Sequence, residues 1–157
     1  MALLKGEYQA TLDEKGRVSI PARFREGIPN NVLILTYSMS TVEACIWAFT
    51  PENHEKVVSS LRNFWSANAN MSMTFEQKVM FDHRVGFSIK EVEIDKTGRI
   101  MIIPKFRDYA GLTKDCVVTS DGICIKIWDA ERHAEYERKI EEQFGALLDK
   151  MGPINLY

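Results

Sequence analysis

Two arginines in this sequence follow a short Asp-x-x-Gly segment, and their chemistry is that of anion and guanine recognition. The segments are Asp13-Glu14-Lys15-Gly16-Arg17 and Asp95-Lys96-Thr97-Gly98-Arg99. A guanidinium presents paired N–H donors that match a carboxylate, a phosphate or the O6 and N7 acceptors of guanine in the major groove. Each arginine could also form an ion pair with the aspartate four residues before it, worth about 1 kcal/mol or less if exposed. The spacing alone leaves both interpretations open.

Further cations lie near each arginine, and they could neutralise phosphates and fix the register on a duplex. Arg23 and Arg25 match Lys105 and Arg107 in the repeat, whereas Lys15 and Lys96 lie within the turns. The aspartates and glycines would shape the turns, because Asp closes a turn with its own side chain and Gly supplies a positive φ. The candidate DNA-binding residues are Lys15, Arg17, Arg23, Arg25, Lys96, Arg99, Lys105 and Arg107, and the turn residues are Asp13, Gly16, Asp95 and Gly98.

The two segments belong to an internal repeat. Residues 12–25 align without gaps to residues 94–107, and six of the fourteen positions are identical: Asp, Gly, Arg, Ile, Phe and Arg. The segment Phe49-Thr50-Pro51-Glu52-Asn53-His54 likewise aligns with Trp128-Asp129-Ala130-Glu131-Arg132-His133. A repeated order of landmarks indicates a duplicated module.

Each copy predicts the same series of short elements. An alternating strand leads into the hairpin turn, a proline ends the next strand, and a short basic helix or turn follows. Asp121-Gly122 is a strong hairpin signal between the last two strands. We expect first strands at 7–12 and 88–94, short helices at 22–26 and 105–110, and further strands at 32–35, 44–49, 116–119 and 124–128.

Helices are predicted to close each half. Thr50-Pro51 starts one, 66–73 is a polar linker, and Thr74-Phe75-Glu76-Gln77 is a capping box for a shorter helix to about Asp82. The last helix should begin near Asp129. Its apolar stripe is more typical of a core or a subunit interface than of a cofactor site; the stripe is Ile140, Phe144, Leu147, Leu148 and Met151.

A lone hairpin of this length cannot bury its apolar face in water, whereas two can interlock. The sequence therefore predicts an α+β fold with two tandem β units flanked by helices. We place the units at 7–54 and 86–130, a helical linker at 55–85, and a C-terminal helix and tail at 131–157.

Composition narrows the function classes. The formal net charge of −2, from 20 Lys+Arg against 22 Asp+Glu, argues mildly against nucleic acid, but Lys15, Arg17, Arg23 and Arg25 cluster within eleven residues. The three cysteines lack CxxC spacing and are expected to be buried hydrophobes. No apolar run is long enough to span a membrane. A cytosolic location is the default.

No sequence motif in the chain indicates an enzyme. The sequence lacks GxxxxGK[ST], GxSxG, HExxH and GxGxxG. His54 and His133 sit at matching helix starts without neighbouring ligand residues, so we expect both to pack on an adjacent strand rather than bind metal. We expect no cofactor and no metal.

The chain resembles the MraZ family. The resemblance is carried by Gly6-Glu7-Tyr8 with residues 12–25, and in the second half by Asp95 to Arg99 and by Tyr109-Ala110-Gly111-Leu112. It implies a swapped-hairpin, AbrB-like (SpoVT-AbrB) fold in which the two repeats form a pseudo-dimeric barrel. It also implies a ring-like homo-oligomer, a nucleoid-associated cytoplasmic location, and the Asp13/Arg17 and Asp95/Arg99 pairs as a DxxxR signature with DNA-facing arginines.

The function implied is sequence-specific regulation of transcription. The resemblance implies binding of double-stranded DNA at direct repeats upstream of the protein's own gene, usually as a repressor of the division and cell-wall gene cluster. We expect repression by occlusion, with several weak turns engaging adjacent repeats at once. The alternative is an oligomeric scaffold in which the Asp–Arg pairs only stiffen the turns.

Overall fold

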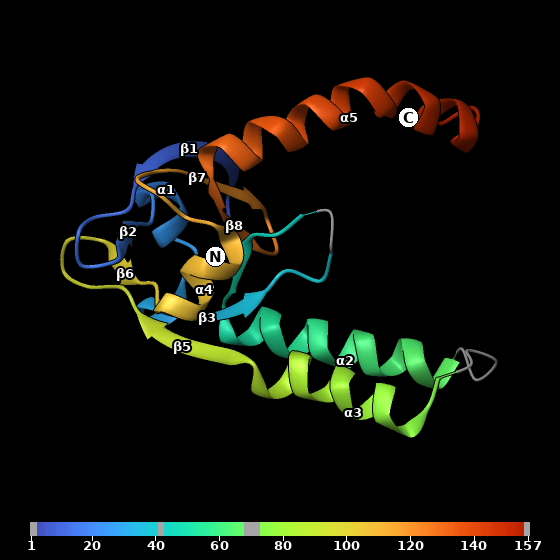
Figure 1. The fold of residues 1–157 in the computed structure, drawn as a ribbon, viewed down its shortest axis with the longest axis horizontal. Helices are drawn as coiled ribbons and strands as arrows, with labels where there is room; N and C mark the ends of the chain where they lie inside the picture. Colours follow the sequence, from blue (N-terminus) through green and yellow to red (C-terminus); the bar gives the residue numbers. More distant parts are fainter. Residues whose placement is uncertain (1–2, 41–42, 68–72, 156–157) are drawn as a thin grey trace.

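The computed structural model describes residues 3–40, 43–67 and 73–155 and has the predicted α+β fold (Figure 1). The first half contains β1 (Lys5–Thr11), β2 (Arg17–Ser19), α1 (Ala22–Arg25), η1 (Pro29–Asn31), β3 (Val32–Tyr37), β4 (Ile46–Phe49), α2 (Pro51–Ala67) and α3 (Phe75–Asp82). The second contains η2 (His83–Phe87), β5 (Ile89–Glu93), β6 (Arg99–Met101), α4 (Pro104–Ala110), β7 (Asp115–Asp121), β8 (Ile125–Asp129) and α5 (Ala130–Met151).

Each half contributes its first strand to the other half. In the six-stranded antiparallel sheet, with order β1-β7-β8-β4-β3-β5, β1 pairs with β7 and β5 pairs with β3. The edge strands therefore cross between the repeats, and neither half completes its own part of the sheet. This exchange is the physical form of the predicted interlocking.

A second, two-stranded sheet holds the strands that follow the turns. β2 pairs with β6, which sets Arg17 opposite Met101 and Ser19 opposite Arg99. The predicted turns at 13–16 and 95–98 are both present, and each is closed by a backbone N–H that Asp13 or Asp95 donates to the arginine carbonyl at 2.9 Å. No ladder between the described strands joins β1 to β5, so the barrel stays a prediction.

Equivalent side chains from both halves meet in one core. Val18, Ile20 and Phe24 are at most 2% exposed, as are their counterparts in the second half, Ile100, Ile102 and Phe106. Side chains alternate between the faces of a strand. Burial of Val18 and Ile100 therefore leaves the flanking Arg17 and Arg99 on the outer face, where both are only half-buried.

The helices form two arms on the side opposite the turns (Figure 1). One arm is the pair α2 and α3, and the other is α5. Their starts follow the predicted caps: Asn53 N donates to Thr50 Oγ1, Gln77 N donates to Thr74 Oγ1 with the reciprocal capping-box bond, and Arg132 N donates to the Asp129 carboxylate. No helix among the described residues is long and apolar enough to cross a membrane.

One expectation about these arms needs correction. Ser66 and Ala67 extend α2 and are not part of the linker, because the helix continues past the predicted end at Trp65; residues 68–72 of the linker lie outside the described residues.

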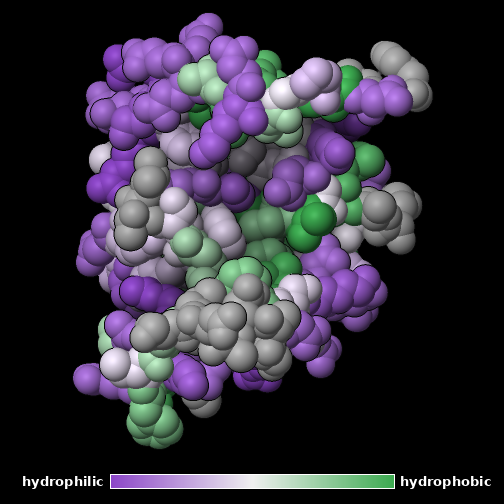
Figure 2. Space-filling view, turned by 90° about the vertical axis from the view of Figure 1, so that its right-hand side faces the viewer, coloured by the Kyte–Doolittle hydropathy of each residue, from purple (hydrophilic) through white to green (hydrophobic). Residues whose placement is uncertain are grey.

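The stripe of α5 is not part of the core of this chain. Ile140, Phe144, Leu147, Leu148 and Met151 are all exposed. Figure 2 looks onto this side and shows hydrophobic residues between the two arms. The structure thus excludes a core role within this chain, and the expected role at a subunit interface stays a prediction.

Candidate nucleic-acid interface

The aspartate carboxylates build the two turns from within. Asp13 Oδ1 accepts the backbone N–H groups of Lys15 and Arg17 at 2.9 and 2.8 Å. Asp95 Oδ1 accepts those of Thr97 and Arg99, both at 2.9 Å. Gly16 and Gly98 have φ values of +83° and +85°, which glycine adopts at little cost.

These hydrogen bonds stabilise the charged form of each aspartate. The backbone N–H of Arg99, together with the hydroxyl and the backbone N–H of Thr97, holds the pKa of Asp95 at about 2. The pKa of Asp13 is lowered in the same way, first by the backbone N–H of Arg17. Both carboxylates are therefore ionised near neutral pH and can pair with cations.

The arginine side chains lie beside these carboxylates. Arg17 Nε donates to Asp13 Oδ2 at 2.8 Å, and Arg99 Nε lies 3.3 Å from Asp95 Oδ2. Arg99 Nη1 also lies 3.5 Å from Asp13 Oδ2 in the other half. The two arginine side chains are 26% and 31% exposed, so each is held by a carboxylate yet open to a partner.

The turns of the two halves also hold each other through the backbone. Ile20 N donates to Gly98 O, and Ile102 N donates to Gly16 O, both at 2.8 Å. Arg25 lies against Gly98 and Arg107 lies against Gly16: a β-carbon at Gly98 would be 2.7 Å from Arg25 Cζ, and one at Gly16 would be 2.8 Å from Arg107 Nη1. The two turns are thus one assembly at one end of the molecule (Figure 1).

The predicted cations separate into two groups. Lys15, Arg23, Lys96 and Lys105 are exposed, whereas Arg25 and Arg107 are half-buried like Arg17 and Arg99. Many of the acidic residues lie at the other end of the molecule, on α5 (Figure 1). This separation explains how a chain of net charge −2 presents a basic end.

Sequence reasoning missed the contacts that cross between the halves. The Asp13–Arg99 approach and the Arg–Gly contacts join residues about eighty positions apart, so no local motif predicts them. Their one sequence signal is the repeat itself, in which an arginine follows each core isoleucine by five residues, at Arg25 after Ile20 and at Arg107 after Ile102.

The histidines and cysteines pack as predicted. His133 is buried against the Trp128 ring, and His54 lies 5.9 Å from the Phe49 ring. The three cysteines are free and buried. Within the described residues, no group of three or more His, Cys, Asp or Glu side chains is placed to hold a metal ion.

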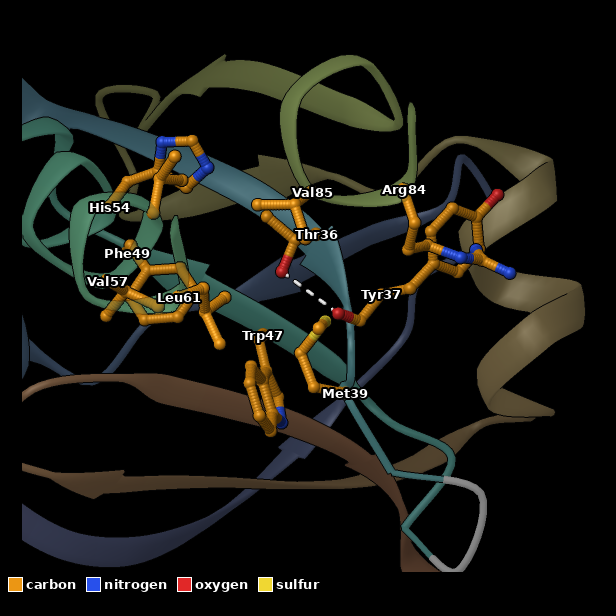
Figure 3. Close-up of a pocket in the computed structure, with 11 residues that line it drawn as sticks. Thr36, Tyr37, Met39, Trp47, Phe49, His54, Val57, Leu61, Arg84 and Val85 are labelled. Atoms are coloured by element: carbon orange, nitrogen blue, oxygen red, sulfur yellow. Dashed lines mark hydrogen bonds between the residues drawn. The ribbon is translucent and has the colours of Figure 1, made fainter. Parts of the chain in front are cut away.

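A small cavity lies between β3, β4, α2 and η2 (Figure 3). Its volume is about 20 Å³, which admits roughly one water molecule. Its lining is mostly apolar, with Trp47, Phe49 and Leu61 on one side and Arg84 stacked 4.0 Å over the Tyr37 ring on the other. The cavity is too small for an organic cofactor.

A family model described as "MraZ protein, putative antitoxin-like" matches residues 3–75 and 89–151, which is most of the chain. The chain belongs to the MraZ family. The family is one of transcriptional regulators and not of enzymes, as predicted. The two matched segments correspond to the two halves of the internal repeat.

Curated relatives align over nearly the whole length. A transcriptional regulator MraZ from Treponema denticola is 32% identical over 96% of this chain and 99% of its own. Relatives of the same name from Treponema pallidum and Symbiobacterium thermophilum are 34% and 31% identical, covering 90% and 94% of this chain and 89% and 99% of their own. A solution structure of PHS018 from Pyrococcus horikoshii covers 81% of this chain and 89% of its own at 15% identity, but its TM-score of 0.30 supports no conclusion about fold.

Proposed function

We propose that this MraZ protein is a sequence-specific double-stranded-DNA-binding repressor that reads bases through Arg17 and Arg99. The observation that carries the proposal is the placement of both arginines on the paired strands β2 and β6, half-exposed at one basic end. A pair of hairpin turns held in fixed relation can enter the major groove together.

The carboxylates fit a role as placeholders. Each Asp lies beside its Arg and leaves the side chain 26% or 31% exposed, so a guanine edge can replace the carboxylate at a small cost in free energy. The exposed lysines, Lys15 and Lys96, flank the arginines and are placed to neutralise phosphates. Base reading and backbone contact are then supplied by neighbouring residues of the same turn.

Assembly belongs to the same proposal. The exposed stripe of α5, represented by Phe144 and Leu148, would be covered by another copy of the chain in a ring-like homo-oligomer. In a ring, several turns that each bind weakly would bind the direct repeats upstream of the protein's own gene at the same time. Occupancy of these repeats would block transcription of the division and cell-wall gene cluster. We place the protein in the cytoplasm, on the nucleoid.

The exchange of β1 and β5 between the halves supports the finer description of the fold. We propose two AbrB-like swapped-hairpin units, 7–54 and 86–130, which form a pseudo-dimeric barrel, with a helical linker at 55–85 and the C-terminal helix and tail at 131–157.

The test is fluorescence anisotropy with DNA from upstream of the protein's own gene, across a salt series. Arg17→Ala and Arg99→Ala should each weaken specific binding by about 5- to 150-fold, the equivalent of about 1–3 kcal/mol for a guanine contact. A control variant, Arg138→Ala, removes equal charge from an exposed position on α5 and should retain specific binding.

Folding and assembly of every variant are verified by thermal melting and light scattering. Equal binding by wild type and the arginine variants, or no binding by either, would refute the proposal. Loss of stability or assembly in Arg17→Ala would favour the scaffold function, in which the Asp–Arg pairs only stiffen the turns.

A further inference from the structure

Arg25 and Arg107 are half-buried like Arg17 and Arg99, but they have a different neighbour, the turn glycine of the opposite half. Each lies at or near the end of a short helix, α1 or α4, and each guanidinium lies against the turn glycine of the opposite half. Arg25 Nε is buried and makes no hydrogen bond among the described residues, and the same is true of Arg99 Nε. The contact with the turn glycine, and not the burial of Nε, therefore distinguishes Arg25 and Arg107.

We propose that Arg25 and Arg107 are positioning residues that hold the opposite half's hairpin turn, and that they are not phosphate contacts. The inference rests on the proposed function, since the turn they hold is the one that presents Arg99 or Arg17 to DNA. Arg25 holds the turn that carries Arg99, and Arg107 holds the turn that carries Arg17.

The contacts at each turn support this role. Gly98 O accepts a hydrogen bond from Ile20 N, and the α-carbon of Gly98 faces the guanidinium of Arg25. One short segment of the first half therefore contacts the residue before Arg99 in two places. The second half repeats the arrangement on Gly16 through Ile102 and Arg107.

The residue types at this contact are complementary. A glycine is required at each turn by its positive φ, and the missing β-carbon leaves room for a flat group to lie against the backbone. The planar guanidinium of arginine fits that space, whereas the compact ammonium of lysine on a flexible stem does not. The charge of Arg25 is therefore less important here than its shape.

The first experiment follows amide hydrogen exchange without DNA, using the full-length protein. Arg25→Gln should accelerate exchange at Thr97, Gly98 and Arg99 and leave the first turn as in wild type, because the contact crosses between the halves. Arg107→Gln should do the reverse, at Lys15, Gly16 and Arg17. Exchange in β7 serves as the control for global stability. Faster exchange confined to the variant's own half, or no change in either turn, would overturn the inference.

The second experiment separates a positioning role from a phosphate contact. Removing a phosphate contact lowers the slope of log K against log salt by about one unit per contact, and replacing Arg by Lys preserves it. We expect Arg25→Gln/Arg107→Gln to weaken operator binding several-fold with an unchanged slope, and Arg25→Lys/Arg107→Lys to be equally weak. Lys15→Gln/Lys96→Gln is the matched control and should lower the slope.

The outcomes distinguish this inference from the proposed function. A reduced slope in the Gln variant, or full rescue by Lys, would identify Arg25 and Arg107 as phosphate contacts and overturn the positioning role. If the variants show the crossed exchange effect but wild-type protein binds no operator, the DNA-binding function is refuted and the positioning role is supported.

Discussion

Phe24 provides a test of whether the two repeats fold as one unit. Its side chain is 0% exposed and packs edge-on against Tyr8 at 5.2 Å between ring centroids. Truncation of a fully buried phenylalanine to alanine costs about 3–5 kcal/mol, from lost transfer free energy and the cavity that remains. We expect Phe24→Ala to lower the free energy of unfolding by that amount, a large part of the roughly 5–15 kcal/mol of a typical domain.

The exchanged strands make a second consequence measurable. Because β1 pairs with β7 and β5 pairs with β3, the free energy of unfolding should decrease by the same amount in both halves. The assay is urea unfolding at fixed protein concentration, with amide exchange followed in β3 and β7. Phe75→Ala is the matched control, since Phe75 is 83% exposed and its removal should change stability by less than about 0.5 kcal/mol.

Two outcomes would refute this reasoning. A loss below about 1 kcal/mol would mean that Phe24 is not in a close-packed core. Loss of protection in β3 with full protection in β7 would mean that the halves unfold separately, and the exchanged strands would then not couple them.

Further predictions concern charge, assembly and thiol chemistry. Hydrogen bonds to Asp95 hold its pKa at about 2, below its ordinary value of 3.8, so its stabilisation is present above about pH 4 and is lost as pH falls towards 2. The melting-temperature difference between wild type and Asp95→Asn should therefore shrink over that range; a constant difference would contradict this. Phe144→Asp should shift the protein to smaller species in light scattering, and an unchanged mass would exclude the α5 stripe as an interface. Burial raises the pKa of the Cys45 and Cys124 thiols and that of Cys116 to about 11. Native protein should resist iodoacetamide at neutral pH and react at all three cysteines in denaturant, as read by mass spectrometry; alkylation of the folded chain would show that the thiols are open to solvent.

Local chemistry allowed much of the structure to be predicted from sequence. The turns were predictable because Asp and Gly have specific backbone roles within four residues, and the helix starts at Pro51, Phe75 and Ala130 followed their caps. The end of α2 was not predictable in the same way. The stretch from Ser66 to Met73 carries no strong stop signal, and its small polar residues are compatible with either helix or loop.

The sequence by itself determined the repeat, the two turns and the cations they carry, since each depends on residues close together in the chain. Only the tertiary structure decided which half holds which turn. The pairing of β2 with β6 accompanies the contacts of Arg25 with Gly98 and of Arg107 with Gly16, whose free energy depends on residues distant in the sequence. The tertiary structure also decided which cations are exposed and which are half-buried, because burial depends on packing and not on residue type.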